Sequence, residues 1–294
     1  MGKGIVMLKK YKAIFFDWDG TAVLSRKASA REAIEAMRPL LQKGIKLVIV
    51  SGTTIENIAG GKLECFFTEA ELENLYLGLG RGAYNYTFRD GKPYVFKSMV
   101  PPKQELLKIH RICFEIHQEL KEKYNFDTDI VFSRPNYCKI DIMVENQRGE
   151  NLFMQEDELG RLKTALKEHG IEEGLQGLMR LAEKTGKKYG IEVCPTCDAK
   201  YLEVGVTSKS HNVDCILEQI CRDGEILPED CAYWGDEYLG IEDGIFGSDS
   251  FMRTERSQKG DFFDVSEASG IRPEGVLEVG GGVEKFLGFL HEQN

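Results

Sequence analysis

Two aspartates follow directly after an apolar run near the start of the chain. In AIFFDWDGTAVL the run AIFF predicts a short buried strand; Asp17 and Asp19 come after it, and Gly20 follows. An Asp-Gly pair between apolar runs is also a strong signal for a β-hairpin, in which the two carboxylates only flank a turn. The alternative is that they hold a cation and a phosphoryl group, and the choice depends on what the other strands carry.

Polar residues of matching chemistry follow three later segments. Ser51 follows IKLVIV, Lys209 comes shortly after KYLEVGV, and Asp236 follows CAYWG. In open α/β sheets ligands bind beyond the carboxyl ends of the strands, so parallel strands would bring these residues to one edge. Carboxylates that lie close together repel one another, and a bound divalent cation removes that repulsion. Magnesium prefers oxygen ligands and commonly bridges to a phosphate, so the set predicts a Mg²⁺ and phosphate site.

Each of these residues also has a plain structural interpretation. Ser51-Gly52-Thr53-Thr54 offers a hydroxyl and backbone N–H groups to an anion at a helix start, or simply caps the helix. An exposed Lys209 in a first helical turn would cost only about a few tenths of a kcal/mol. An EF-hand is excluded because Ala28 stands where its loop needs glutamate, and no nucleotide-binding glycine motif follows a strand. The functional interpretation depends on the order of these residues along successive strand–helix units.

The composition excludes several classes of protein. The 294-residue chain is 42% hydrophobic and 29% charged, with a net charge of -10, which is ordinary for a soluble globular protein. The acidic balance argues against nucleic acid or an anionic membrane as a partner. No apolar stretch reaches the ~18 residues of a membrane helix and no signal peptide is evident, so we expect a cytoplasmic protein, monomer or homodimer. The eight cysteines are expected to be reduced, with CPTC (Cys194 to Cys197) a hairpin connection or, alternatively, a metal or redox pair.

The apolar spacing predicts one α/β unit interrupted by another. Strand, helix and strand at 13–16, 29–44 and 45–50 form a βαβ unit, which favours a parallel sheet. The middle of the chain predicts a hairpin turning at Asp90-Gly91, a long helix after Pro101-Pro102, two strands and two more helices. The remaining predicted elements are a third strand within 71–86, a strand at 200–206 where the first pattern resumes, a helix within 207–224, a strand before Asp236, and a last strand and helix within 275–290.

Taken in order, these residues resemble the four motifs of the haloacid dehalogenase-like (HAD) phosphohydrolases. Motif one is similar to Asp17-Trp18-Asp19-Gly20-Thr21, motif two to Ser51, motif three to Lys209 and motif four to Gly235-Asp236. The resemblance implies a Rossmann-like core with a parallel sheet at 1–83 and 189–294, and an inserted α/β cap of the C2 type at 84–188. The insertion is similar to the cap of the Cof-type branch (subfamily IIB), which includes sugar-phosphate phosphatases and phosphomannomutases.

The resemblance implies a role for each motif. Asp17 would be the nucleophile that forms an aspartyl-phosphate, and Asp19 would protonate the leaving oxygen and then deprotonate the attacking water. The Asp17 carboxylate, the Asp19 backbone carbonyl and Asp236 would hold Mg²⁺. The residues expected at the transferring phosphoryl group, where charge stabilisation dominates catalysis, are Ser51, Gly52 and Lys209, with Thr21 ordering the loop.

Two stretches depart from the family's pattern. The third strand ends in Arg81-Gly82-Ala83 where members often have Asn-Gly-Ala, so Arg81 is expected either to supply a cation near the phosphate or to be a surface arginine. Motif four, GDEYLGIEDG, is longer than usual and lacks Asn. Its second acid, a further metal ligand, is expected to be Asp243, with Glu237, Glu242 and Asp249 as rivals.

Substrate choice is expected to lie in the inserted unit. SRPNYCK gives Arg134, Asn136 and Lys139, which either bind substrate hydroxyls or a second anion, or are solvated surface groups. The implied activity is Mg²⁺-dependent hydrolysis of a small phosphorylated metabolite such as a sugar phosphate. A phosphosugar mutase and a non-catalytic sensor of a phosphorylated metabolite are the alternatives. Trp18 has no role in this interpretation beyond packing.

Overall fold

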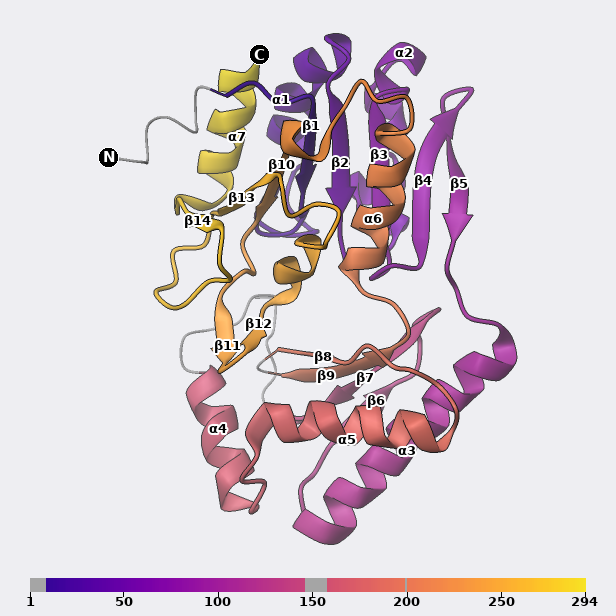
Figure 1. The fold of residues 1–294 in the computed structure, drawn as a ribbon, viewed down its shortest axis with the longest axis vertical. Helices are drawn as coiled ribbons and strands as arrows, with labels where there is room; N and C mark the ends of the chain where they lie inside the picture. The colour runs from indigo at the N-terminus through magenta and orange to yellow at the C-terminus, as the bar shows by residue number, and fades with distance from the viewer. Residues whose placement is uncertain (1–8, 146–157, 199) are drawn as a thin grey trace. The chain divides into compact units, whose positions relative to one another are not determined.

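The computed structural model describes residues 9–145, 158–198 and 200–294 (Figure 1). The chain divides into two compact units, and each contains its own sheet. Unit 1 comprises the described residues of Met1–Ser98, Lys209–Leu239 and Asp249–Asn294, and unit 2 those of Met99–Ser208 and Gly240–Ser248. The chain therefore leaves unit 1 and returns to it twice.

Unit 1 is built on an eight-stranded sheet. Six neighbouring strands pair in parallel, and the last two continue the sheet as an antiparallel hairpin. The mainly parallel α/β sheet confirms the predicted fold class. In order across the sheet the strands are β14 (Val276–Glu278), β13 (Asp261–Asp264), β10 (Cys231–Gly235), β1 (Ala13–Phe16), β2 (Lys46–Val50), β3 (Leu75–Leu79), β4 (Tyr84–Arg89) and β5 (Lys92–Ser98).

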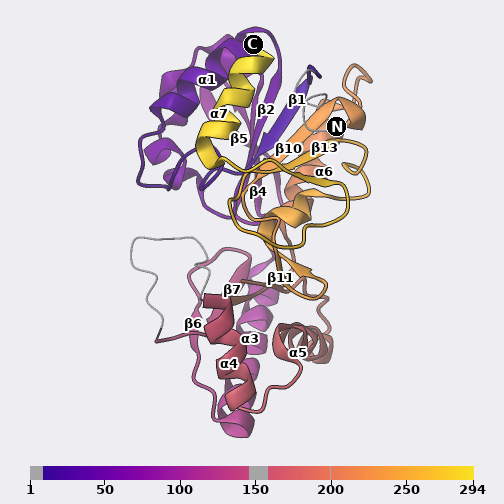
Figure 2. The ribbon, with the colours of Figure 1, turned by 90° about the vertical axis from the view of Figure 1, so that its left-hand side faces the viewer.

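Helices cover both faces of this sheet. Side chains alternate between the faces of a strand, so Ile14 and Phe16 enter one core and Phe15 enters another. The first core includes side chains of α1 (Arg31–Gln42) and α7 (Gly282–Gln293), which lie together on one side of the sheet in Figure 2. The second core includes side chains of α6 (Lys209–Ile220). Burial on both faces explains why the central strands are continuously apolar.

Short elements complete unit 1. They shape the loops beside the sheet and, in three cases, consist of a single tight turn of 3₁₀-helix. These elements are η2 (Ile55–Asn57), η3 (Ala59–Gly61), η4 (Leu63–Phe66), α2 (Glu69–Leu72), η5 (Pro228–Asp230) and η6 (Ser248–Met252).

Unit 2 has a four-stranded antiparallel sheet that is covered on one face. Alternate residues Cys138, Ile140, Leu202 and Val204 pack against the helices, and the opposite face carries polar side chains. No helix in the described part of the chain is both long enough and apolar enough to cross a membrane. In sheet order the strands are β6 (Asp129–Val131), β7 (Tyr137–Asp141), β9 (Tyr201–Gly205) and β8 (Thr196–Cys197), and the other elements are α3 (Lys103–Tyr124), α4 (Glu158–Glu168), α5 (Gly174–Lys188), β11 (Gly240–Glu242) and β12 (Ile245–Phe246).

The two units differ from the predicted domain boundaries of 1–83, 84–188 and 189–294. The hairpin at 84–98 belongs to unit 1 because β4 pairs with β3. Residues 189–208 belong to unit 2 because β9 pairs antiparallel with β7 and β8. The strand predicted at 200–206 is therefore present, but it does not continue the parallel sheet. Pairing between strands decides both cases: β4 pairs with the strand just before it in the sequence, and β9 pairs with the distant β7.

Candidate functional site

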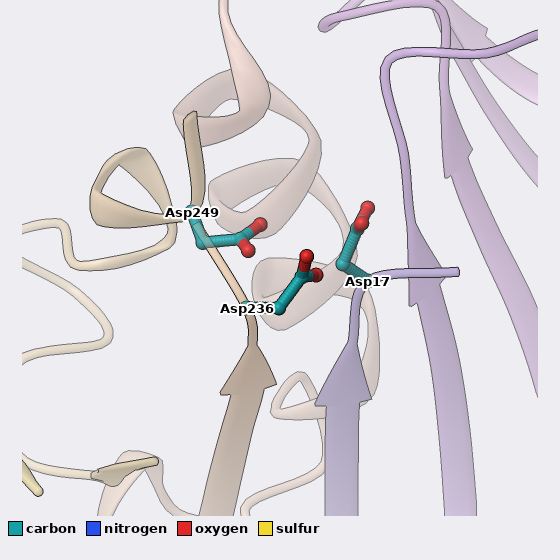
Figure 3. A group of neighbouring side chains, drawn as sticks. All are labelled: Asp17, Asp236 and Asp249. Atoms are coloured by element: carbon teal, nitrogen blue, oxygen red, sulfur yellow. The ribbon is translucent and has the colours of Figure 1, made fainter. Parts of the chain in front are cut away.

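Three aspartates of unit 1 meet at the carboxyl edge of the parallel sheet (Figure 3). Asp17 directly follows β1, Asp236 directly follows β10, and Asp249 lies at the start of η6. β1 and β10 are parallel neighbours with Phe16 opposite Trp234, so the two strands end side by side. One oxygen of each carboxylate lies within 4.8 Å of those of the other two, which is the arrangement of a site for a divalent cation.

Two glycines leave room for these carboxylates. A Cβ atom on Gly20, whose φ is +87°, would lie 2.2 Å from Oδ2 of Asp236. A Cβ atom on Gly235 would lie 2.3 Å from Oδ2 of Asp249. Any other residue at either position would displace an acid, so the Asp19-Gly20 pair does more than turn the chain. The backbone does turn here, with Gly20 N donating to the carbonyl of Val23, but no hairpin of regular strands forms.

Lys209 forms ion pairs with two of the three acids. Its Nζ donates to Asp17 Oδ1 at 3.0 Å and to Asp249 Oδ1 at 2.7 Å, and all three side chains are buried. Lys209 reaches the sheet edge as the first residue of α6, which packs across the sheet, and not from the end of a parallel strand as the sequence suggested. The predicted meeting of Asp17, Asp236 and Lys209 is thus present in the structure, by a different route.

Burial dominates the electrostatics of the acids. Burial raises the pKa of Asp17 well above its ordinary range; Lys209 opposes this rise, while Asp249 and Glu237 add to it. Burial, followed by Asp249, raises the pKa of Asp236 in the same way. Burial alone would lower the pKa of Lys209, but Asp17 and Asp249 hold it well above the ordinary lysine value. One ammonium cannot balance three carboxylates, so the donor set and its surplus negative charge fit an oxygen-coordinated divalent cation.

Asp19 and Thr21 lie on the same loop. The Thr21 hydroxyl donates to Asp236 Oδ1 at 2.9 Å and so links the loop to one of the acids. Asp19 Oδ2 faces the Arg26 guanidinium at 3.5 Å, a partner that the sequence analysis did not identify. The other oxygen, Oδ1, is buried and accepts no hydrogen bond from the described residues. Burial raises the pKa of Asp19 above its ordinary value, and Arg26 opposes the rise.

Ser51 and Arg81 lie on adjacent loops of unit 1. β2 is parallel to β1 with Ile49 opposite Phe16, so buried Ser51 and exposed Gly52 leave the sheet at the same edge as Asp17. Gly80 N donates to the Thr53 carbonyl at 2.8 Å and joins the two loops. Arg81 is 4% exposed, so the interpretation as a surface arginine is wrong. Its backbone has a φ of +55°, which a tight turn after β3 requires.

Asn212 fixes the loop after β3, and the sequence analysis missed it. It lies one turn after Lys209 on α6 and is fully buried. Its Oδ1 accepts from Gly82 N at 2.7 Å, and its Nδ2 donates to Asn85 Oδ1 at 2.9 Å. The i, i+3 spacing of Lys209 and Asn212, two polar residues on one helix face, was the available signal.

Asp249, and not Asp243, completes the acid group. Asp243 lies in unit 2, in the exposed turn between β11 and β12, where its backbone carbonyl accepts from Gln176 Nε2. Its neighbour Glu242 accepts from Leu175 N at 2.8 Å and so caps the start of α5. The hairpin β11–β12 contains Glu242 and Asp243, and neither belongs to the acid group. The next acid along the chain is Asp249, and it lies with Asp17 and Asp236. Asp249 Oδ2 also accepts from Glu237 N at 2.8 Å.

The residues predicted to choose the substrate lie in unit 2. Lys139 is on the polar face of β7, where its Nζ pairs with Glu203 at 2.7 Å and lies over the Tyr201 ring. Burial alone would lower the pKa of Lys139, and Glu203 raises it above the ordinary value. Asn136 is buried and donates to Thr207 Oγ1 at 2.8 Å. Arg134 is half-buried on the loop between β6 and β7.

Comparison with known proteins identifies the fold. No protein-family model and no curated protein sequence matches the chain. Among solved structures, the N-terminally truncated, IMP-bound IMP-nucleotidase of Plasmodium falciparum matches with a TM-score of 0.60 at 14% identity, over 97% of this chain and 68% of its own. Trehalose-6-phosphate phosphatase of Aspergillus fumigatus matches with a TM-score of 0.53 at 13% identity, over 96% and 91%. The chain therefore has the HAD-like α/β fold, which the order of its motifs predicted.

Proposed function

We propose that this protein is a Mg²⁺-dependent phosphatase that hydrolyses a small phosphorylated metabolite through an aspartyl-phosphate on Asp17. The observation that carries the proposal is the buried group of Asp17, Asp236, Asp249 and Lys209 at the carboxyl edge of the sheet. A buried structural ion-pair network would balance its charges, and this one leaves an excess of carboxylate. The structures of an IMP-nucleotidase and a trehalose-6-phosphate phosphatase, which share the fold, support a phosphomonoester as substrate.

Asp17 is the proposed nucleophile. One carboxylate oxygen attacks phosphorus, and the bond from phosphorus to the ester oxygen of the substrate breaks, so the phosphoryl group moves to the enzyme. Lys209 binds Oδ1 of Asp17, which orients the carboxylate and places a positive charge beside the transferring group. Water then attacks the phosphorus of the acyl phosphate, and phosphate leaves with Asp17 restored.

Asp19 is the proposed proton shuttle. Its Oδ1 accepts no hydrogen bond from the described residues, so it is available to a leaving oxygen or a water molecule. In the first step Asp19 gives its proton to the leaving oxygen, and in the second it takes one from the attacking water. Arg26 holds the other oxygen and keeps the carboxyl group oriented.

The cation is assigned to the acid group. Asp17, Asp236 and Asp249 would hold Mg²⁺ through their carboxylates, with the backbone carbonyl of Asp19 as the further ligand that the family resemblance implies. When bound, the ion neutralises the carboxylates and the charge of the phosphoryl oxygens. Ser51, Gly52 and buried Arg81 are proposed to bind the remaining phosphoryl oxygens.

Unit 2 is proposed to be the cap that selects the substrate, as in the Cof-type branch. The polar face of its sheet, with Lys139, Glu203 and Tyr201, offers both charges and an aromatic ring to a hydroxyl-rich ligand such as a sugar phosphate. Arg134 and Asn136 come just before β7 in the sequence and are proposed to contribute to this site. We also propose a cytoplasmic location, and a monomer or homodimer.

Release of free phosphate tests the proposal. Purified protein with Mg²⁺ is assayed against a panel of sugar phosphates and nucleoside monophosphates, and at least one should release phosphate. Asp17→Asn should abolish turnover while circular dichroism and the thermal midpoint stay close to those of the unaltered protein. Asp223→Asn, which changes an exposed carboxylate of unit 1, serves as the matched control and should keep full activity.

Three outcomes would contradict the proposal in different ways. Turnover that survives Asp17→Asn would exclude the nucleophile. Consumption of a sugar phosphate with no free phosphate would favour the mutase. Binding of a panel member by the unaltered protein with no reaction at all would favour the sensor.

A further inference from the structure

A cavity of unit 1 is lined in part by the loop that carries Asp19. It has a volume of about 500 Å³, which is within the range of small-molecule sites. It is formed by the loop at 18–30, the first half of α1, and the turns η3 and η4, and we call it the α1 cavity. Its lining includes Trp18, the residue of motif one to which the proposed function gives no task.

The α1 cavity is rich in guanidinium groups, and each of them has one carboxylate partner. Arg26, Arg31 and Arg38 line it, and Glu35 is the one carboxylate of the lining. Three guanidinium groups therefore line one cavity in a chain whose net charge is -10, and a ligand with phosphoryl groups would compete with their carboxylate partners. Guanidinium groups in such a cluster match the geometry of phosphoryl oxygens and bind them through paired hydrogen bonds.

The three arginines differ in how firmly they are held. Arg38 is fixed, because its guanidinium donates to the Phe66 carbonyl at 2.6 Å and to Glu71 at 3.2 Å. Arg31 pairs with Glu35 on the surface at 2.8 Å, a contact that contributes little to stability and leaves the guanidinium accessible. Arg26 is held by Asp19 at 3.5 Å, a long ion pair. The cavity thus presents one fixed cation and two that a ligand can recruit.

The rest of the lining is apolar and aromatic. Ile34 and the indole of Trp18 are buried, and the Phe66 ring is 44% exposed beside the arginines. An exposed aromatic ring next to guanidinium groups suits a ligand that joins a flat ring to phosphoryl groups, because the ring stacks while the phosphoryl oxygens bind the cations. An inorganic anion would use only the charged half of the cavity.

We propose that the α1 cavity binds a nucleoside diphosphate, at a site distinct from the acid group. The ligand's phosphoryl groups contact Arg26 and Arg31, and its base packs against the apolar part of the lining. The proposal does not depend on the proposed phosphatase activity, since it requires no turnover and no divalent cation. Arg26 contacts both the cavity and Asp19, so an occupied cavity changes the surroundings of Asp19.

Binding of ADP in the presence of EDTA tests this proposal. Without a divalent cation the acid group repels a diphosphate, so binding under these conditions reports on a different site. Calorimetry should detect one ADP per chain, and pyrophosphate and adenosine should each bind more weakly than ADP. Trp18 and Trp234 are the two tryptophans of the chain, and Trp234 is fully buried in the core, so ADP should change the emission of Trp18 alone.

Variants locate the bound ADP. Arg31→Gln should weaken ADP binding about three- to tenfold, as expected for loss of one exposed charge-assisted contact, and the double variant Arg26→Gln/Arg31→Gln more strongly. Arg256→Gln removes a comparable exposed ion pair outside the cavity lining and should leave ADP binding unchanged. Trp18→Phe should abolish the change in emission while calorimetry still detects binding.

Two results would overturn the proposal. One is an absence of heat and of emission change with ADP in EDTA, in a protein whose thermal midpoint shows that it is folded. The other is ADP binding that the double arginine variant leaves unchanged, which would place the nucleotide outside the α1 cavity.

Discussion

Replacing Asp249 by asparagine tests which acid completes the proposed cation site. Asp249 is fully buried, and its two oxygens are both used: Oδ1 accepts from Lys209 at 2.7 Å and Oδ2 from Glu237 N at 2.8 Å. An amide has one acceptor oxygen and one NH₂ group. The Asp249→Asn substitution therefore removes a charge from the acid group and turns a donor toward either the ammonium or the backbone N–H.

The magnitude follows from the kind of contact that is lost. A carboxylate ligand to Mg²⁺ is worth at least as much as a charge-assisted hydrogen bond, about 1.5–3 kcal/mol, which corresponds to about 10- to 150-fold in affinity. Asp249→Asn should weaken Mg²⁺ binding by at least this factor. At a Mg²⁺ concentration equal to the dissociation constant of the unaltered protein, a tenfold weaker site is occupied about 5-fold less often, so phosphate release should fall by at least about 5-fold.

Asp243→Asn is the matched control for this experiment. Asp243 is exposed in the β11–β12 turn and contributes its backbone carbonyl, which the substitution retains, to the contact with Gln176. Mg²⁺ affinity is measured by calorimetry and Mn²⁺ affinity by electron paramagnetic resonance, so the result does not depend on knowing the substrate. The assignment fails if Asp249→Asn binds these ions as tightly as the unaltered protein, or if Asp243→Asn weakens them equally.

Two further predictions concern stability. The pKa of Asp236 is raised in the folded protein above its ordinary value of 3.8, so the metal-free folded state binds a proton that the unfolded chain has released. The contribution of this group to stability in EDTA should therefore fall as the pH rises above about 4. Asp236→Asn should remove this contribution, which urea denaturation at a series of pH values measures. A pH dependence that the substitution leaves unchanged would contradict that cause. Arg272→Ala should destabilise unit 1 by about 3–5 kcal/mol because it strands the buried Asp264 carboxylate, 2.7 Å from Arg272 Nε, while Mg²⁺ affinity stays unchanged. A loss much below this range would show that the pair is compensated by solvent.

Local sequence predicted the parts of the site that directly follow strands. An apolar run that ends in polar residues marks the end of a buried strand, and a βαβ order makes neighbouring strands parallel. These two facts predict Asp17, Ser51 and Asp236 at one edge of the sheet, and the parallel registers of β1, β2 and β10 agree with this placement. The Asp90-Gly91 pair also predicts a hairpin from local sequence alone. Both residues have the positive φ of a two-residue hairpin turn, +49° and +68°.

Contacts between distant segments were not predictable in this way. The antiparallel pairing of β9 with β7 places the strand before Lys209 in unit 2. The ion pair of Arg26 with Asp19 and the hydrogen bonds of Asn212 depend on how loops and α6 pack. Residue type and spacing do not indicate which distant segments of the chain come into contact.

The site differs from the prediction in two ways: Lys209 does not follow a strand of the parallel sheet, and Asp249 stands where Asp243 was expected. Both differences follow from the path of the chain between the two units. Two separate segments of the chain belong to unit 2. The residue that follows each segment and begins the next part of unit 1 is a member of the site: Lys209 after the first segment and Asp249 after the second. These two residues bind each other at 2.7 Å, so the ends of both connections are fixed at the same point. Asp243 lies in the second of these segments, where its backbone carbonyl accepts from Gln176 of unit 2. The acid that completes the group comes after the hairpin β11–β12, where the first acid along the chain is Asp249.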